Sequence, residues 1–143
     1  MDNNYVRRGA IAIIVKNNKI LMGKKCHRPG HFLSDAWHFP GGKAEVDEPI
    51  EKTVVREMKE ELGITVKIVR KLAEYTSTVG DSTSHGTVFL CESDEQPVAG
   101  DDLVDAHYFD YEDTLKLHDK ASFERLPAEV KEYLATLKVS ETV

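Results

Sequence analysis

The spacing of apolar residues changes along the chain from that of strands to that of helices. Gly9 to Val15 (GAIAIIV) is rich in apolar and β-branched residues, and a second short apolar run follows at Ile20 to Met22. The polar residues between these runs include Asn17 and Asn18. Because short apolar runs on either side of an Asn-Asn turn are typical of paired strands, this segment predicts a β-hairpin.

A helical spacing of apolar residues begins at about Pro49 and ends at Leu62. At ~100° per residue, the apolar stripe that should face a sheet consists of Ile50, Val54, Met58 and Leu62. Proline is tolerated in the first turn of a helix, and Gly63 has the backbone freedom that a helix C-terminus favours. The segment therefore predicts a helix with one buried face.

The rest of the chain predicts strands, loops and one more helix. Strands are expected at residues 65–71, 87–91 and 106–109, and loops at 26–36, 76–86 and 92–102. The Pro-Gly-Gly run at 40–42 predicts a sharp turn, because proline and glycine interrupt strands. Pro127 begins an amphipathic helix. Strands mixed with two substantial helices predict an α/β or α+β sandwich with the sheet in the middle.

Length and charge narrow the classes of function. A chain of 143 residues, of which 41% are hydrophobic, predicts one domain, residues 1–143, with its own core. The net charge is −6 and no run of basic residues occurs, which disfavours binding of long nucleic acids through their phosphates. A small polyanion held by a metal ion is compatible with this charge, because the cation supplies the local positive charge.

The cysteines and the N-terminal sequence indicate the cellular compartment of the protein. Cys26 and Cys91 form neither a zinc motif nor a disulfide framework, and so predict two reduced thiols. The N-terminal residues MDNNYVRRG lack the apolar core of a signal peptide. No stretch approaches the ~20 apolar residues that a membrane span needs. We therefore expect a cytoplasmic protein that does not contact a membrane.

The last turns of the predicted helix, REMKEELG at residues 56–63, carry an unusual set of charges. Glu60 and Glu61 follow Glu57 by three and four positions, and like charges at this spacing destabilise a helix by roughly 0.2–0.5 kcal/mol per pair. They also lie near a helix C-terminus, where the dipole favours cations. Such a group is either a solvated charged face or a set of oxygen ligands for a hard divalent cation.

Residues upstream of this helix complete a longer pattern. Every defined position of the signature G-x5-E-x7-R-E-U-x-E-E-x-G-U, in which U is aliphatic, is occupied here by Gly42, Glu48, Arg56-Glu57-Met58, Glu60-Glu61 and Gly63-Ile64. The chain therefore resembles the Nudix hydrolases, and the likeness extends to nearly the whole chain. The resemblance implies an α+β fold, an α/β/α sandwich with a central mixed β-sheet between helices.

The resemblance also implies an activity. Nudix hydrolases use water to cleave a nucleoside diphosphate linked to another group, and usually require Mg²⁺ or Mn²⁺. We expect water to attack phosphorus and break a phosphoanhydride bond in a nucleoside di- or triphosphate or a nucleoside diphosphate derivative. The competing interpretation is a non-catalytic nucleotide-binding or sensor module that keeps the fold. Such a descendant would be free to lose signature glutamates, and none is lost here.

The expected metal ligands follow from the same resemblance. Glu57 and Glu61 are the principal ligands, and Glu60 is a further ligand, directly or through water. The carbonyl group of Gly41, in the turn before the helix, is expected to complete the metal shell. Asp102 is a candidate for an additional ligand, with an exposed acidic loop as the competing explanation.

The expected catalytic group consists of Glu57, Glu60, Arg56 and Glu48. The general base varies among Nudix hydrolases. Glu57 is the first candidate here, with an acidic residue of the later loop as the alternative. Arg56 is expected to pair with Glu48 or with a signature glutamate and to hold it in place.

The sequence leaves the substrate open. Family members that act on ADP-ribose often have a proline shortly past the signature, and residues 77–81 contain none. MutT-like enzymes use a late asparagine to read the base, and no asparagine follows Asn18. Phe32 and Trp37 are candidate contacts to base or sugar, with packing aromatics as the alternative. The expected partner is a small nucleotide, and the protein is expected to be a monomer or a homodimer.

Overall fold

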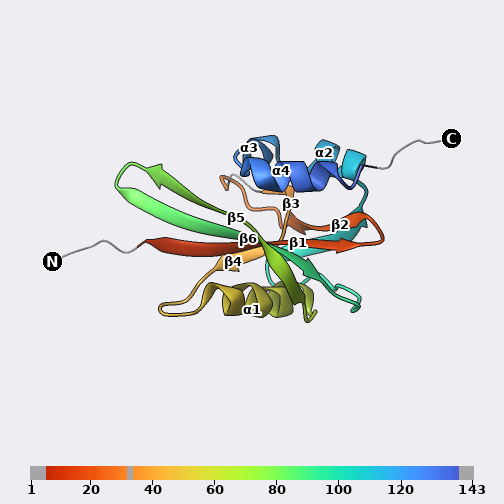
Figure 1. Ribbon diagram of the computed structural model, residues 1–143, viewed down its shortest axis with the longest axis horizontal. Coiled ribbons are helices and arrows are strands. Elements are labelled where there is room, and N and C mark those ends of the chain that lie inside the picture. Colours follow the sequence, from red (N-terminus) through yellow and green to blue (C-terminus); the bar gives the residue numbers. More distant parts are fainter. Residues whose placement is uncertain (1–5, 32–33, 139–143) are drawn as a thin grey trace.

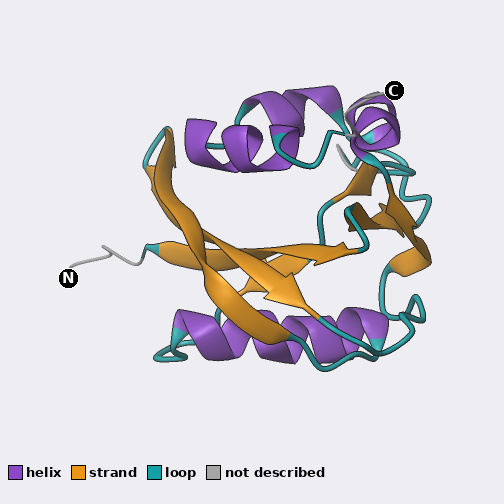
Figure 2. Cartoon of the chain, turned by 45° about the vertical axis from the view of Figure 1, so that its right-hand side comes forward, coloured by secondary structure: helices purple, strands orange, loops and turns teal. Residues whose placement is uncertain are grey.

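In the computed structural model, which describes residues 6–31 and 34–138, a β-sheet lies between one helix and a group of shorter helices (Figure 1). The helices are α1 (Ile50–Leu62), α2 (Tyr111–Leu117), α3 (Lys120–Glu124) and α4 (Ala128–Ala135). The strands are β1 (Arg7–Lys16), β2 (Lys19–Lys25), β3 (Trp37–His38), β4 (Gly41–Lys43), β5 (Lys67–Val79), β6 (Ser82–Glu92) and β7 (Leu103–Phe109). Figure 2 shows the same layers from a second direction, with α1 alone on its side of the sheet. The predicted α/β/α sandwich is confirmed.

Strand β1 lies at the centre of the sheet. The strand order is β3-β2-β1-β6-β5, with β4 pairing with β1 and β7 pairing with β2 outside this path. β1 runs parallel to β6 and antiparallel to β2 and β4. The sheet is therefore mixed, as the family resemblance implies.

The predicted N-terminal hairpin is present as β1 and β2. Lys16 pairs with Lys19, so the turn consists of Asn17 and Asn18, whose φ angles are 52° and 64°. Asparagine tolerates this left-handed conformation better than most residues, and two such residues in succession match the twist of paired strands. The Asn-Asn pair therefore explains where the hairpin turns.

Two apolar layers fill the space on the two faces of the sheet. On the α1 side, Val54, Met58 and Leu62 of the predicted stripe are fully buried. They pack in one cluster with Ala10 and Ala12 of β1, whose small side chains leave room for the helix. The opposite face of the sheet packs on α4 through a second cluster. The apolar stripe of α1 therefore faces the sheet as predicted.

The loop predicted at residues 76–86 is wrong. β5 continues to Val79 and β6 begins at Ser82, so this segment is the end of a long hairpin (Figure 1). Thr76, Ser77 and Thr78 are exposed, and a strand that buries neither face has no apolar alternation to reveal it. Threonine nevertheless favours strands because it is β-branched.

The sharp turn predicted for the Pro-Gly-Gly run is also wrong. Residues 41–43 form β4, and Gly41 pairs with Ile11 of β1. A β-carbon on Gly41 would overlap the carbonyl oxygen of Ala10, so only glycine permits this approach. Pro40 precedes the strand, where its missing N–H costs no ladder hydrogen bond.

Helices α2 and α3 lack a counterpart in the sequence prediction, because 7 and 5 residues are too short for an apolar period. Each begins with an aspartate cap: Asp110 accepts a hydrogen bond from the Asp113 N–H at 2.8 Å, and Asp119 accepts one from the Ser122 N–H at 3.0 Å. Over the described part of the chain, no helix is both long enough and apolar enough to cross a membrane.

Candidate active site

Helix α1 presents its carboxylates beside the strand that precedes it. The helix ends at Gly63, which has a left-handed φ of 67° and donates its N–H to the Lys59 carbonyl oxygen at 3.1 Å. Where the helix lies beside β4, a β-carbon on Gly42 would overlap the Glu57 carboxyl group. Glycine at position 42 therefore lets the Glu57 side chain lie directly against the backbone of β4.

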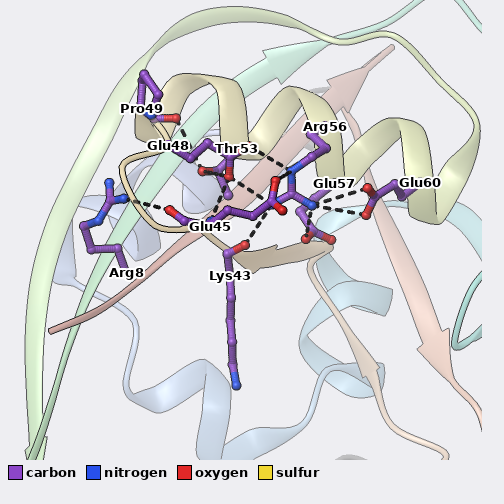
Figure 3. A network of polar contacts seen from close by, with 9 residues as sticks. All are labelled: Arg8, Lys43, Glu45, Glu48, Pro49, Thr53, Arg56, Glu57 and Glu60. Carbon is purple, nitrogen blue, oxygen red and sulfur yellow. Dashed lines mark hydrogen bonds and ion pairs between the residues drawn. The ribbon is translucent and has the colours of Figure 1, made fainter. Parts of the chain in front are cut away.

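Arg56 lies at the centre of a polar network (Figure 3). Its Nε and Nη2 atoms donate to the two carboxylate oxygens of Glu48 at 2.8 and 2.9 Å, and Nη2 also donates to the Lys43 carbonyl oxygen at 2.9 Å. Its Nη1 atom donates to Glu57 Oε1 at 3.0 Å and to Glu60 Oε2 at 3.2 Å. The predicted pairing of Arg56 with Glu48 is present, and the same guanidinium also contacts two carboxylates of the helix.

Glu48 accepts hydrogen bonds from more than Arg56. The Thr53 hydroxyl donates to its Oε1 atom at 2.7 Å, and the Glu45 N–H donates to the same oxygen at 3.1 Å. Arg56, the Glu45 backbone and Thr53 together lower the pKa of Glu48 to about 2, because each hydrogen bond favours the charged carboxylate. Thr53 is fully buried, so the network is anchored at the edge of the core.

Glu57 and Glu60 differ in how far the fold encloses them. The Glu57 side chain is 14% exposed, and burial raises its pKa although the Arg56 charge opposes this effect. The Glu60 side chain is 49% exposed. Glu57 therefore lies inside the site, and Glu60 lies at its rim.

Glu61 is a buried carboxylate with an incomplete environment. It is 4% exposed, and within the described residues its Oε2 atom has no hydrogen-bond partner. Burial raises the pKa of Glu61 to about 8, even though the positive charge of Lys25 acts in the opposite direction. Because an unpaired buried charge is costly, this position favours a protonated carboxyl group or a carboxylate with a bound cation.

Asp102 reaches the same region from the loop that follows β6. This loop is tied to the end of α1, since the Gly100 N–H donates to the Glu61 carbonyl oxygen at 2.8 Å. The Lys25 ammonium lies 2.7 Å from Asp102 Oδ2. Burial alone would raise the pKa of Asp102, but the hydrogen bond and charge of Lys25 outweigh it, so the pKa is lowered.

The donor set fits a divalent cation that shares its shell with a ligand. Mg²⁺ in proteins is usually held by one or two carboxylates, several waters and substrate phosphates. Glu57 and Glu61 supply two enclosed carboxylates, one with an unpartnered oxygen. Across residues 6–31 and 34–138, no three His, Cys, Asp or Glu side chains converge as a ready-made metal site. Two enclosed carboxylates are within the number that a protein usually contributes to Mg²⁺.

The remaining candidate residues have different positions. Gly41 begins β4, directly before the glycine that contacts Glu57. The Trp37 ring lies edge-on to Phe109, with 5.0 Å between ring centroids. Phe32 lies outside the described residues. Contact of Trp37 and Phe32 with a substrate stays a prediction.

Two further side chains near the carboxylates, Lys25 and His38, are not marked by any pattern in the sequence. Lys25 meets Asp102 only because β2 and the late loop come together in the fold. The His38 Nδ1 atom hydrogen-bonds the Phe39 carbonyl oxygen at 2.7 Å, and burial lowers the His38 pKa to about 4. Strand alternation is the one feature of the sequence that could have marked Lys25, because it places the Lys25 side chain on the same face of β2 as Gly23.

Known proteins share both the sequence pattern and the fold. The family model described as the NUDIX domain matches residues 6–128. An ADP-ribose pyrophosphatase of Methanocaldococcus jannaschii is 37% identical over 76% of this chain and 66% of its own length. An 8-oxo-dGTP diphosphatase of Buchnera aphidicola is 39% identical over 39% of this chain and 42% of its own length. The chain thus spans less than two thirds of these curated relatives.

A solved structure extends the likeness to three dimensions. The crystal structure of a MutT NUDIX hydrolase from Burkholderia pseudomallei superposes with a TM-score of 0.70 at 25% identity. The match covers 85% of this chain and 95% of that one.

Proposed function

Because the chain belongs to the Nudix hydrolase family, we propose that it hydrolyses a phosphoanhydride bond in a nucleoside di- or triphosphate or a nucleoside diphosphate derivative, with Mg²⁺ or Mn²⁺ as cofactor. The family resemblance inferred from residues 42–64 is confirmed by the match to residues 6–128. The observation that carries the proposal is Glu61, a buried carboxylate with an unpartnered oxygen on the signature helix. A divalent cation would supply the partner that this oxygen lacks.

Five groups would hold the metal ion. Glu57 and Glu61 would be the enclosed ligands and Glu60 a ligand from the rim. Asp102 and the Gly41 carbonyl group are the further expected ligands, and the carboxylates would have to draw together around the ion, because the described side chains do not converge on one point without it. A divalent cation supplies charge neutralisation for the phosphate oxygens that would otherwise repel an incoming water.

The chain's own residues would orient and deprotonate the water. Arg56 fixes Glu57 by donating to its Oε1 atom at 3.0 Å, and Glu48 fixes Arg56 through two hydrogen bonds. Glu57 is thereby held in one position as the proposed general base. An acidic residue of the later loop, such as Asp102, is the alternative base.

The substrate proposal rests on the names of the relatives. The two curated relatives described above act on ADP-ribose and on 8-oxo-dGTP. The match to the first covers more of the chain, so ADP-ribose is the first compound to test, although the proline often found in such enzymes is missing from residues 77–81. Oxidised and normal nucleoside triphosphates come next.

A substrate screen tests the proposed function. The protein is incubated with Mg²⁺ and a panel of ADP-ribose, nucleoside di- and triphosphates, dinucleotides and coenzyme conjugates, and the products are separated by ion-exchange chromatography. We expect turnover of at least one compound and none with Glu57→Gln. Tight nucleotide binding without turnover of any compound would favour a sensor module instead.

A further inference from the structure

The carboxylates of the candidate site are flanked by two cations that are held in different ways. Arg56 donates to Glu57 and Glu60, but it also donates to both oxygens of Glu48 and to the Lys43 carbonyl oxygen, and these three hydrogen bonds do not involve the expected metal ligands. Lys25 donates to Asp102 Oδ2 at 2.7 Å, and the described residues offer its ammonium no hydrogen-bond acceptor other than Asp102. Several acceptors therefore hold Arg56 in place, whereas Lys25 loses its one described acceptor if another cation binds Asp102.

The local geometry places Lys25 close to the proposed metal ligands. The β2–β7 pairing is irregular between Lys24 and Lys25, and Lys25 lies opposite Leu103, the residue after Asp102. The Lys25 side chain is 19% exposed, and its charge acts on the buried Glu61 carboxyl group as well as on Asp102. Lys25 therefore holds one of the expected metal ligands, Asp102, and contributes to the charge balance around Glu61.

We propose that Lys25 is the exchangeable cation of this site: it neutralises Asp102 in the free protein, and it moves to a phosphate group of the substrate when a divalent cation takes the Asp102 carboxylate. This inference rests on the proposed function, because it uses a metal ion and a phosphate-bearing substrate. A second observation, which does not involve Lys25, also points to a cation: the Oε2 atom of Glu61, a residue that is 4% exposed, has no hydrogen-bond partner among the described residues.

The exchange makes metal and substrate binding depend on each other. A metal ion that binds alone must displace the Lys25 ammonium from a 2.7 Å ion pair and leave it without a counter-charge. A phosphate that arrives with the metal supplies that counter-charge, and a lysine on a flexible stem readily follows it. By linkage, nucleotide then strengthens metal binding by the same factor by which metal strengthens nucleotide binding.

Metal affinity without nucleotide tests the first half of the exchange. Mn²⁺ is titrated into the wild type, Lys25→Met and Lys24→Met, with calorimetric detection. The neighbouring Lys24→Met control removes the same charge from a side chain that alternation places on the other face of β2. We expect Lys25→Met to bind Mn²⁺ about 5-fold more tightly than Lys24→Met does. Equal or weaker binding by Lys25→Met would overturn the proposal.

Nucleotide affinity in saturating Mn²⁺ tests the second half. The probe is the non-hydrolysable α,β-methylene analogue of ADP. We expect Lys25→Met to lose about 10-fold in affinity, and Lys25→Arg to retain most of it because the charge is kept. Unchanged affinity in Lys25→Met would overturn the transfer to phosphate. Both measurements record binding and not turnover, so a failure of this proposal can be distinguished from a failure of the proposed function in the substrate screen.

Discussion

Two groups of side chains around helix α1 hold carboxylates in opposite ways, and we call them the Arg56 flank (Glu48, Thr53, Arg56 and Glu57) and the Glu61 flank (Glu61 with Lys25 and Asp102). On the flank around Arg56, every charge has a partner within the protein: Glu48 receives hydrogen bonds from Arg56 and Thr53, and Glu57 from Arg56 (Figure 3). On the flank around Glu61, an unpartnered oxygen lies near a single Lys25–Asp102 pair in the described part of the protein. The first flank is complete in the free protein, and the second is not.

This difference separates the roles of the signature residues. A complete hydrogen-bond network stabilises the native fold and fixes the direction of Glu57. A buried carboxyl group without a partner disfavours its charged form, so a cation that binds there would stabilise the folded state. Substitutions on the two flanks should therefore affect different measurements, and the predictions below run from the largest effect to the smallest.

Glu61→Gln should reduce turnover by about 1,000-fold or more, because several kcal/mol of charge stabilisation depend on the metal ligands. Because burial raises the pKa of Glu61 to about 8, its carboxyl group is mainly neutral in the metal-free protein at pH 7, and the uncharged, similarly shaped glutamine should leave that protein about as stable as the wild type. Steady-state kinetics and urea unfolding check the two halves. A variant that is inactive only because it has unfolded would contradict the proposed role of Glu61.

Arg56→Leu should clearly destabilise the metal-free protein, because it leaves the Glu48 carboxylate without its charged donor. Lys59→Leu is the matched control, since it removes an exposed positive charge from the same helix. Urea unfolding without metal measures both variants. Equal stability of the two variants would show that the Arg56 network does not hold the flank together.

Thr53→Val should cost about 1 kcal/mol of unfolding free energy, because it removes the hydroxyl that donates to Glu48 at 2.7 Å while keeping the shape of a fully buried side chain. The loss should be the same with and without Mg²⁺. A loss that disappears in Mg²⁺ would place Thr53 in the metal-dependent flank instead.

The loss of folding stability at acid pH should come from the Arg56 flank. The pKa of Glu48 is lowered to about 2 from an ordinary value of 4.5. The folded state therefore favours the charged form, and this contribution to stability is present above pH 4.5 and lost as the pH falls towards about 2. In that window, thermal unfolding of metal-free Glu48→Gln should depend less steeply on pH than that of the wild type. Identical slopes would remove Glu48 from the acid transition.

Regular spacing and local caps made α1 predictable from the sequence. Its four apolar residues repeat at helical positions, and Gly63 ends the helix with the left-handed φ that glycine permits. The turn at Asn17 and Asn18 was predictable for a similar local reason. The ends of β5 and β6 were not, because exposed strands of threonine and serine carry no apolar alternation.

The residues of the candidate site likewise divide into those that the sequence identified and those that only the fold brings together. Its glutamates and Arg56 belong to one contiguous pattern, so the family resemblance identified them. Lys25 and Asp102 are 77 positions apart, and only the pairing of β2 with β7 brings them together. The low exposure of Glu61 also depends on tertiary packing, which the helical pattern alone does not determine.

Thermal unfolding of the wild type and of Glu61→Gln, with Mg²⁺ titrated into each, tests most directly whether a cation completes the Glu61 flank. At a metal concentration of about 100 times the dissociation constant, the melting temperature of the wild type should rise by roughly 5–10 °C. Glu61→Gln should show little or no rise over the same range. An equal rise in both proteins would contradict the account, because the metal would then bind without the buried carboxylate.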